Sequence, residues 1–255
     1  MKIISYNVNG LRAAIEKGFA SWLADELPDV LCLQETKLQE EQFPRELFSD
    51  LGYSSYLFCA TRKRGYSGVA ILCRQEPDSL AEGMGMPDYD AEGRFLRADF
   101  GDLSVVSVYH PSGTSGEERQ SFKMQWLADF RGYVTELRKS RPKLILCGDY
   151  NISHEPIDIH DPIRNAKNSG FLPEEREWMT GFLDSGFTDS FRYKNPTLRQ
   201  YSWWSYRSFA RRNDKGWRLD YCMVSNEAHD RIEDAYILGN VVHSDHCPVA
   251  LVIRG

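Results

Sequence analysis

The chain has 255 residues, 42% of them hydrophobic, which is ordinary for a folded globular protein with a substantial core. Its net charge of −6 counts against a protein that coats nucleic acid by charge alone. It does not exclude an enzyme that combines a local basic patch with a metal cation. No apolar run approaches the roughly 20 residues needed to cross a bilayer, and the stretch MKIISYNVNG is too short for a secretory signal. We therefore expect a cytoplasmic protein without membrane association.

Eight apolar runs separated by turns are predicted strands, and several are continuous aliphatic runs, which are typical of strands covered on both faces. In chain order they are Ile3–Val8, Val30–Gln34, Gly68–Cys73, Phe95–Phe100, Leu103–Tyr109, Leu144–Gly148, Leu219–Val224 and Pro248–Ile253. Cys32, Cys73 and Cys147 lie inside aliphatic runs of this set, and no C-x-x-C pair occurs. We therefore expect buried, reduced thiols rather than a zinc site.

Three segments have the pattern of helices. Glu117–Lys139 carries apolar residues at helical spacing, and Pro173–Ser185 begins with Pro and two Glu and is followed by Gly. Leu11–Leu27 is a third predicted helix, broken near Gly18. Helices interleaved with strands, with no second compositional block, predict a single α/β domain over residues 1–255.

Polar side chains follow or open many of the predicted strands, where functional groups of α/β proteins gather. They are Asn7, Asn9, Glu35, Asp149, Asn151, Asp220, Asp245 and His246. Each of them alone is more typical of a turn or helix cap. Together, hard oxygen ligands with few nitrogens suit Mg²⁺ or Mn²⁺, and a His beside them suggests hydrolysis of a phosphate ester. The chain has neither a G-x-S-x-G elbow nor a P-loop lysine motif, so a covalent serine mechanism or an NTPase has no support.

Seven motifs distributed from Lys2 to Ile253 resemble those of the exonuclease III family of apurinic/apyrimidinic endonucleases. They are SYNVNGLR, LCLQETK, GYSGVAIL, LILCGDYNIS, YSWWSYR, GWRLDYCMVS and SDHCPVALVI. The Q-E-T, G-D-x-N and S-D-H elements also occur in the wider endonuclease/exonuclease/phosphatase superfamily, whereas LQETK, GYSGVA, WWSYR and GWRLDY indicate the repair branch. The resemblance implies a four-layered α/β sandwich of the DNase I type, with two central sheets flanked by helices.

The resemblance also implies a metal site and a catalytic group. Mg²⁺, with Mn²⁺ as a substitute, is expected at Asn7, Glu35 and Asp245, and a second ion, if present, at Asp149, Asn151 and His246. The implied catalytic residues are Tyr109, Asp149, Asn151, Asp220 and His246. Asp149 would orient or deprotonate the attacking water, Tyr109 would contact the scissile phosphate, and Asp220 would hold the ring of His246. The alternative for Asp220 is a salt bridge to Arg218.

Contacts to DNA are carried over in the same way. The implied positions are Arg64, Tyr66, Arg94, Ser112, Asn165, Asn168, Trp203, Arg207, Trp217 and Leu219. The loop RKRGYSG is basic and aromatic, although a solvated turn is the plainer alternative. Trp203, Trp217 and Leu219 resemble the walls of a pocket for an extruded abasic sugar, with ordinary core packing as the alternative.

One departure from the family concerns the segment after Tyr109. Ser112 stands where the family usually has Asn or Gln, and residues 114–118 replace a longer basic loop with small and acidic residues. This departure bears on how strongly the protein grips duplex DNA and on its exonuclease activity.

The expected function is Mg²⁺-dependent hydrolysis of the phosphodiester 5′ to abasic sites in duplex DNA, by a monomer. We also expect 3′–5′ exonuclease activity and removal of blocked 3′ ends. Two alternatives are a lipid or inositol phosphate phosphatase with the same core and a catalytically silent DNA-binding module. The Trp pocket and the RKRGYSG loop favour a DNA enzyme, and a silent module is disfavoured because no site residue is missing.

Overall fold

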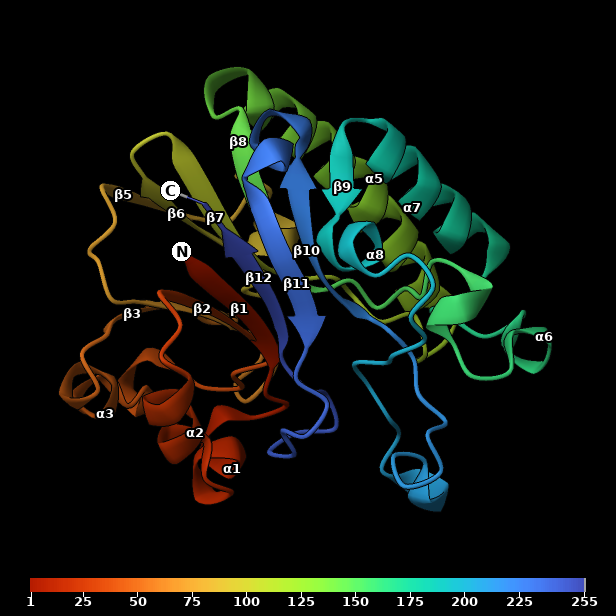
Figure 1. Cartoon of the computed structure of the whole chain (residues 1–255), viewed down its shortest axis with the longest axis horizontal. Coiled ribbons are helices and arrows are strands. Elements are labelled where there is room, and N and C mark those ends of the chain that lie inside the picture. Colours follow the sequence, from red (N-terminus) through yellow and green to blue (C-terminus); the bar gives the residue numbers. More distant parts are fainter. Residues whose placement is uncertain (255) are drawn as a thin grey trace.

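Two six-stranded sheets lie face to face in the computed structural model, which describes residues 1–254 apart from the side chain of Ser208 (Figure 1). The first sheet has the order β11 (Ile232–Ile237), β12 (Val249–Ile253), β1 (Lys2–Asn7), β2 (Val30–Gln34), β4 (Val69–Cys73) and β3 (Ser54–Phe58). The second has the order β5 (Ser79–Glu82), β6 (Phe95–Phe100), β7 (Leu103–Tyr109), β8 (Lys143–Asp149), β10 (Asp220–Ser225) and β9 (Phe187–Asp189). At the centre of each sheet is one parallel pair, β1–β2 and β7–β8, with antiparallel neighbours.

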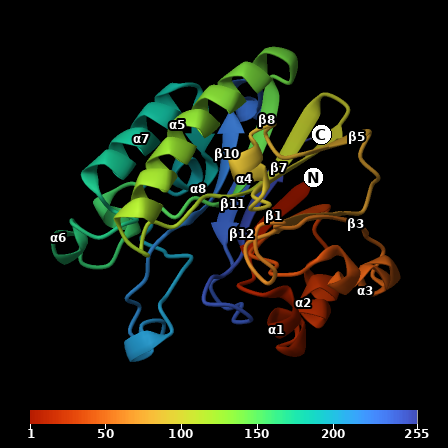
Figure 2. The same cartoon turned by 180° about the vertical axis from the view of Figure 1, so that it is seen from behind.

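Helices cover the outer face of each sheet (Figure 2). Outside the first sheet lie α1 (Leu11–Glu16), α2 (Phe19–Glu26) and α3 (Arg45–Asp50), and outside the second lie α5 (Glu117–Ser140) and α7 (Pro173–Asp184). The shorter helices are α4 (Pro87–Asp90), α6 (Pro162–Asn165), α8 (Ser190–Lys194), η1 (Glu40–Gln42), η2 (Pro156–Asp158), η3 (Arg207–Phe209) and η4 (Asn226–Arg231). The expected four-layered sandwich is therefore confirmed.

The apolar runs of the central strands serve two cores at once. Ile3 and Val105 point into the core between the sheets, whereas their neighbours Ile4 and Val106 point into the cores beneath the helices. Alternate residues of a strand face opposite sides, so a strand covered on both faces needs a continuous apolar run. This explains why these strands were recognisable in the sequence.

All eight predicted strands are present, with their ends displaced by one residue at most. The predicted helix over Leu11–Leu27 divides into α1 and α2 at Gly18, whose φ of +99° favours glycine. Four strands were not predicted: β3, β5, β9 and β11. The cysteines are free and five of them are buried, as expected, while Cys59 is half-buried. Within the described residues, no helix is both long enough and apolar enough to traverse a lipid bilayer.

A buried ion cluster fixes the entry to β10. The guanidinium of Arg218, fully buried, donates to the Asp158 carboxylate at 2.8 and 3.0 Å and lies 2.7 Å from Asp189. The alternative interpretation of Asp220, a salt bridge to Arg218, is therefore wrong, because other carboxylates occupy that guanidinium. Burial would raise the pKa of Asp158, but Arg218 outweighs it and lowers this pKa to about 2.

We expect Arg218→Met to destabilise the fold at pH 7 by roughly 3–5 kcal/mol, because it leaves buried carboxylates without a partner. The loss should shrink toward pH 4 as the orphaned carboxylates take up protons. In the wild-type protein, the Asp158 contribution is complete above the pKa of an unfolded aspartate, near 3.9, and is lost as the pH falls toward 2. Urea unfolding at several pH values measures both effects.

The matched control is Arg231→Met, which breaks the more exposed pair between Arg231 and Asp102. It should cost less than about 1 kcal/mol. Equal losses for the two variants would contradict the importance of the buried cluster.

Candidate active site

The ends of the parallel strand pairs bring the polar residues together. Asn7 ends β1 and Glu35 directly follows β2, while Tyr109 and Asp149 end β7 and β8 and are register partners. Asp220 begins β10 opposite Asp149, because β10 runs antiparallel to β8. Parallel neighbours end at the same edge of a sheet, so the topology itself gathers these side chains.

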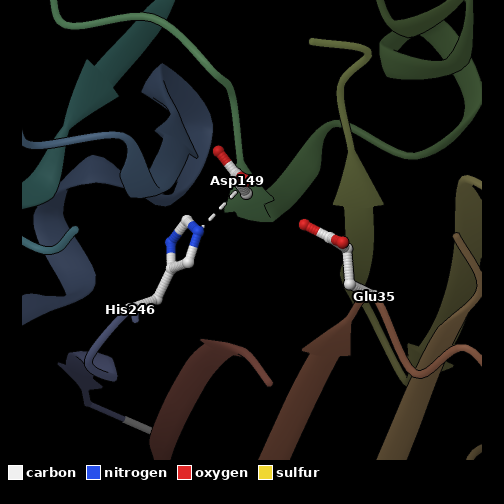
Figure 3. Close-up of side chains that lie close together, drawn as sticks. All are labelled: Glu35, Asp149 and His246. Atoms are coloured by element: carbon white, nitrogen blue, oxygen red, sulfur yellow. Dashed lines mark ion pairs between the residues drawn. The ribbon is translucent and has the colours of Figure 1, made fainter. Parts of the chain in front are cut away.

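Glu35, Asp149 and His246 form the centre of the site. Each offers a ligand atom, and these atoms lie within 4.8 Å of one another. Figure 3 shows the three side chains turned toward a common space, with His246 Nε2 3.8 Å from Asp149 Oδ2. Glu35 has a φ of +50°, in the left-handed region, which is a strained conformation of the kind that concentrates at functional sites. This group is able to hold a metal ion.

Amides connect the carboxylates of the site. Asn7 Nδ2 donates to Glu35 Oε1 and to Asp149 Oδ2, both at 2.9 Å, and so joins the two sheets. Asn7 therefore turns its nitrogen to the central cluster, and its role as a metal ligand stays a prediction. Asp245 accepts hydrogen bonds from Asn9 Nδ2 at 3.0 Å and Trp203 Nε1 at 3.1 Å. Its carboxylate lies beside the centre, and its role near the metal also stays a prediction.

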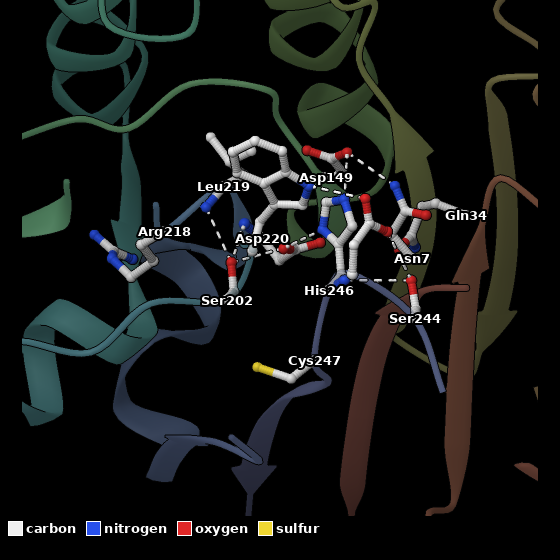
Figure 4. Close-up of polar contacts among 12 residues, drawn as sticks. Asn7, Gln34, Asp149, Ser202, Arg218, Leu219, Asp220, Ser244, His246 and Cys247 are labelled. Carbon is white, nitrogen blue, oxygen red and sulfur yellow. Dashed lines mark hydrogen bonds and ion pairs between the residues drawn. The ribbon is translucent and has the colours of Figure 1, made fainter. Parts of the chain in front are cut away.

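The expected pairing of Asp220 with His246 is present. His246 Nδ1 donates to Asp220 Oδ2 at 2.8 Å, and Ser202 Oγ donates to the same oxygen at 2.6 Å (Figure 4). Both Asp220 and His246 are buried. The carboxylate therefore fixes the imidazole so that Nε2 faces Asp149.

The electrostatics of the cluster follow from its burial. Burial alone would lower the pKa of His246, but the Asp220 carboxylate outweighs it and raises that pKa above its ordinary value. Burial raises the pKa of Asp149, and the nearby carboxylates of Asp220 and Glu35 add to this against the effect of His246. The direction of these shifts favours the imidazolium form of His246 and makes Asp149 a stronger base than an ordinary aspartate.

Tyr109 and Asn151 complete the floor of the site. Burial, with the Glu35 carboxylate nearby, raises the pKa of Tyr109 far above its ordinary value, so the phenol stays protonated. Asn151 has a φ of +52°, and its Nδ2 donates to the carbonyl of His110 at 2.9 Å and to Asp149 Oδ2 at 3.3 Å. Asn151 Nδ2 thus shares the Asp149 oxygen that Asn7 contacts, and the backbone N–H of Asn151 donates to the other oxygen, Oδ1, at 2.8 Å.

A cavity of about 610 Å³ opens over this floor. One wall is apolar and consists of Trp203, Trp217 and Leu219, with the two indole rings edge to face at a centroid distance of 6.1 Å. The charged groups adjoin this wall, because Trp203 bonds to Asp245 and its ring centroid lies 6.4 Å from that of His246. Of the predicted site residues, the cavity is lined by Glu35, Tyr109, Ser112, Asp149, Asn151, Asn168, Trp203, Trp217, Leu219, Asp245 and His246. The Trp residues therefore line a cavity rather than filling a core.

Several predicted DNA-binding residues lie elsewhere. Arg64 is exposed and paired with Glu41, Arg207 is exposed on η3, and Asn165 bonds to the backbone of its own loop. Their contacts to DNA stay predictions.

The phosphate contact expected for Arg94 stays a prediction, and the structure gives it no support. Arg94 is 1% exposed, and its guanidinium bonds to groups of the protein. Among these partners is the hydroxyl of the half-buried Tyr66, whose contact to DNA also stays a prediction.

The sequence interpretation missed two functional side chains, Lys167 and Ser202, besides five further residues of the cavity lining, Gly113, Thr114, Gly116, Ser169 and Gly170. Lys167 lines the cavity and is exposed, so it is a cation at the rim. The signal for Lys167 was its place between Asn165 and Asn168 in NAKNSG. Ser202 stabilises the Asp220–His246 pair, and no local pattern distinguished it from other serines.

Comparison with known proteins agrees with this geometry. The model of the Endonuclease/Exonuclease/phosphatase family matches residues 4–246. The exodeoxyribonuclease of Bacillus subtilis (strain 168) is 45% identical over 256 positions, covering all of both chains. The DNA repair nuclease APEX1 of Danio rerio is 42% identical over 99% of this chain and 82% of the relative.

Solved structures lead to the same branch of the family. An AP endonuclease from Archaeoglobus fulgidus superposes with a TM-score of 0.91 at 30% identity, over the full length of both chains. The 3′ phosphatase NExo from Neisseria, bound to a product DNA hairpin, superposes with a TM-score of 0.93 at 30% identity, also over both full chains. The chain therefore belongs to the endonuclease/exonuclease/phosphatase family, in the branch of exodeoxyribonucleases and AP endonucleases that act as DNA-repair nucleases.

Proposed function

We propose that the protein is a Mg²⁺-dependent nuclease that cleaves duplex DNA on the 5′ side of an abasic site. In addition, we propose that it trims blocked 3′ ends and removes nucleotides from 3′ ends. The observation that carries the proposal is that one cavity is lined both by the charged groups Glu35, Asp149 and His246 and by an apolar wall that includes Trp203 and Trp217. A sugar without its base fits against such a wall, and flipping it out of the duplex costs little because nothing is stacked or paired.

The relatives support this choice of substrate. The solved neighbours include an AP endonuclease and a 3′ phosphatase bound to a DNA hairpin. Their names describe reactions at abasic sites and at 3′ ends. Lys167 at the rim, together with the exposed Arg62, Lys63 and Arg64, supplies positive charge for the DNA backbone.

Each residue of the floor has a separate task in the proposed reaction. Water attacks the phosphorus, Asp149 takes the proton of that water, and the phosphorus–O3′ bond breaks. The protonated phenol of Tyr109 donates to the departing O3′ atom, which leaves as a 3′-hydroxyl. His246, held as an imidazolium by Asp220, donates from Nε2 to a non-bridging phosphate oxygen and stabilises the charge that develops there.

The residues present fit a divalent cation. Glu35 is the strongest candidate to hold it: burial would raise its pKa, but Lys37, Asn7 and His246 outweigh burial, and its pKa lies below the ordinary value. It therefore stays ionised. A bound Mg²⁺ would neutralise charge on the phosphate and on the leaving oxygen.

We expect the wild-type protein to cleave a duplex containing a tetrahydrofuran abasic analogue with added Mg²⁺, and to lose this activity in EDTA. Asp149→Asn should lower kcat by about 10²–10⁴-fold, the usual contribution of a general base, with an unchanged far-UV circular dichroism spectrum. Gel-resolved cleavage of a labelled strand measures both effects.

The same protein, assayed with inositol phosphates under these conditions, should release no phosphate. Efficient hydrolysis of inositol phosphates without cleavage of the duplex would replace the proposal with the phosphatase alternative. DNA binding without any hydrolysis would indicate the silent module.

Asp220→Asn tests the electrostatic pair. Without the carboxylate, burial dominates and the pKa of His246 should fall below its ordinary value, whereas in the wild-type protein it lies above that value. Nitrogen-15 NMR of the imidazole in EDTA should therefore show an imidazolium at pH 7 in the wild-type protein and a neutral ring in the variant. A neutral ring in both proteins would refute the role given to Asp220.

Trp217→Ala should relax selection by size. Removing the indole opens the apolar wall, so a nucleotide that still carries its base gains access. We expect the ratio of abasic cleavage to removal of normal 3′ nucleotides to fall about tenfold, a typical effect of a hydrophobic pocket. Trp217→Phe keeps a ring in place and is the control. An unchanged ratio in the Ala variant would show that this wall does not select the substrate.

A further inference from the structure

A buried ionic network lies behind Tyr109 and is not explained by the fold alone. Glu92 is 2% exposed and Arg94 is 1% exposed. Glu92 Oε2 accepts from Arg94 Nε at 2.7 Å, and its two oxygens accept from Arg119 Nη1 at 3.0 Å and Arg119 Nη2 at 3.2 Å. This carboxylate thus hydrogen-bonds to two guanidinium groups, one of them buried, and a third, that of Arg62, forms a longer ion pair with it at 3.7 Å.

Arg94 contacts Tyr109 in three ways. Its Nη1 donates to the Tyr109 carbonyl at 2.9 Å, and its own carbonyl accepts from the Tyr109 backbone N–H at 2.9 Å. The guanidinium carbon also lies 4.6 Å from the centroid of the Tyr109 ring. The main chain and the ring of Tyr109 are therefore both held by one side chain.

Tyr66 fastens the network to the neighbouring loop. Its hydroxyl accepts from Arg94 Nη2 at 2.9 Å and from Arg119 Nη2 at 3.2 Å. A planar fork that bonds to several groups at once is a property of arginine that lysine does not reproduce. The arrangement thus uses the shape of Arg94 and not only its charge.

We propose that Arg94, oriented by Glu92, is a positioning residue that sets the Tyr109 phenol for the leaving oxygen, and that it does not contact DNA phosphate. The inference rests on the role proposed for Tyr109. Burying this cation is expensive and gives little net stability compared with apolar packing, which is consistent with a role in the chemistry.

The first test separates positioning from phosphate binding. Fluorescence anisotropy with an abasic duplex in EDTA measures Kd at several salt concentrations. The slope of log Kd against log salt concentration should be the same for Arg94→Met as for the wild-type protein. A lost phosphate contact would reduce that slope by about 0.9. Lys167→Met, which removes an exposed cation at the cavity rim, serves as the comparison for a reduced slope. A reduced slope for Arg94→Met overturns the proposal.

The second test is a double-mutant cycle on kcat with saturating Mg²⁺. Arg94→Met and Arg94→Lys should each lower kcat by 10–100-fold with little change in KM, and the lysine variant should not rescue activity. In a Tyr109→Phe background, Arg94→Met should cause almost no further loss, because the group that it positions is already absent. Multiplicative losses indicate a structural effect and overturn the proposal.

Glu92→Gln keeps the size of the side chain and provides a variant that folds if Arg94→Met does not. It should lower kcat less than Arg94→Met and show the same lack of additivity with Tyr109→Phe. If the proposed function is wrong, the wild-type protein will not cleave the abasic duplex. In that case the double-mutant cycle of Arg94 and Tyr109 is measured on 3′-exonuclease activity. Losses of kcat that multiply in that assay overturn the inference independently of the proposed function.

Discussion

The pairing of the Asp220 carboxylate with the His246 imidazole is the interaction on which the site depends. Antiparallel pairing of β8 and β10 places Asp220 directly opposite Asp149, at buried positions. Two carboxylates so close in an apolar interior repel each other unless a positive charge lies between them. His246 lies 2.8 Å from one and 3.8 Å from the other, and it comes from the segment before β12 in the facing sheet. The same contact therefore places a positive charge between these two carboxylates and joins the two sheets at their functional end.

The central strands could be predicted from the sequence because their burial leaves a direct record in residue type. The four strands that were missed are the four edge strands of the two sheets, namely β11 and β3 in the first sheet and β5 and β9 in the second. An edge strand is paired on one side only and carries polar residues, as in SLAE of β5 and IEDAYI of β11. Such segments resemble loops when judged by hydrophobic pattern. β9 has only three residues, fewer than a pattern can reveal.

The candidate site likewise has a part that residue type predicts and a part that it does not predict. Carboxylates and amides at strand ends could be predicted to meet, because topology brings those ends together. The direction in which a long side chain points cannot be predicted from residue type. Arg94 and Tyr66 look like surface residues in the sequence, yet Arg94 is buried and its Nη2 bonds to the hydroxyl of the half-buried Tyr66 at 2.9 Å. Whether an arginine binds a ligand or supports its neighbour depends on which carboxylate lies within reach, and Glu92 fulfils that condition here.

The charges of the cavity limit what can enter it. Glu35, Asp149 and Asp245 line the cavity, while the cationic groups at the cavity are His246 and Lys167. A phosphodiester adds a further negative charge, and burying it beside carboxylates is unfavourable unless a cation compensates. Lys37 lies 3.0 Å from Glu35, but it also bonds to Asn9, so it compensates the negative charge of the cavity only in part. A divalent cation at Glu35 would supply the missing charge at the point where the phosphate must sit. The negative charge of the cavity therefore makes a phosphate beside Glu35 more favourable when a divalent cation is bound there than when it is not.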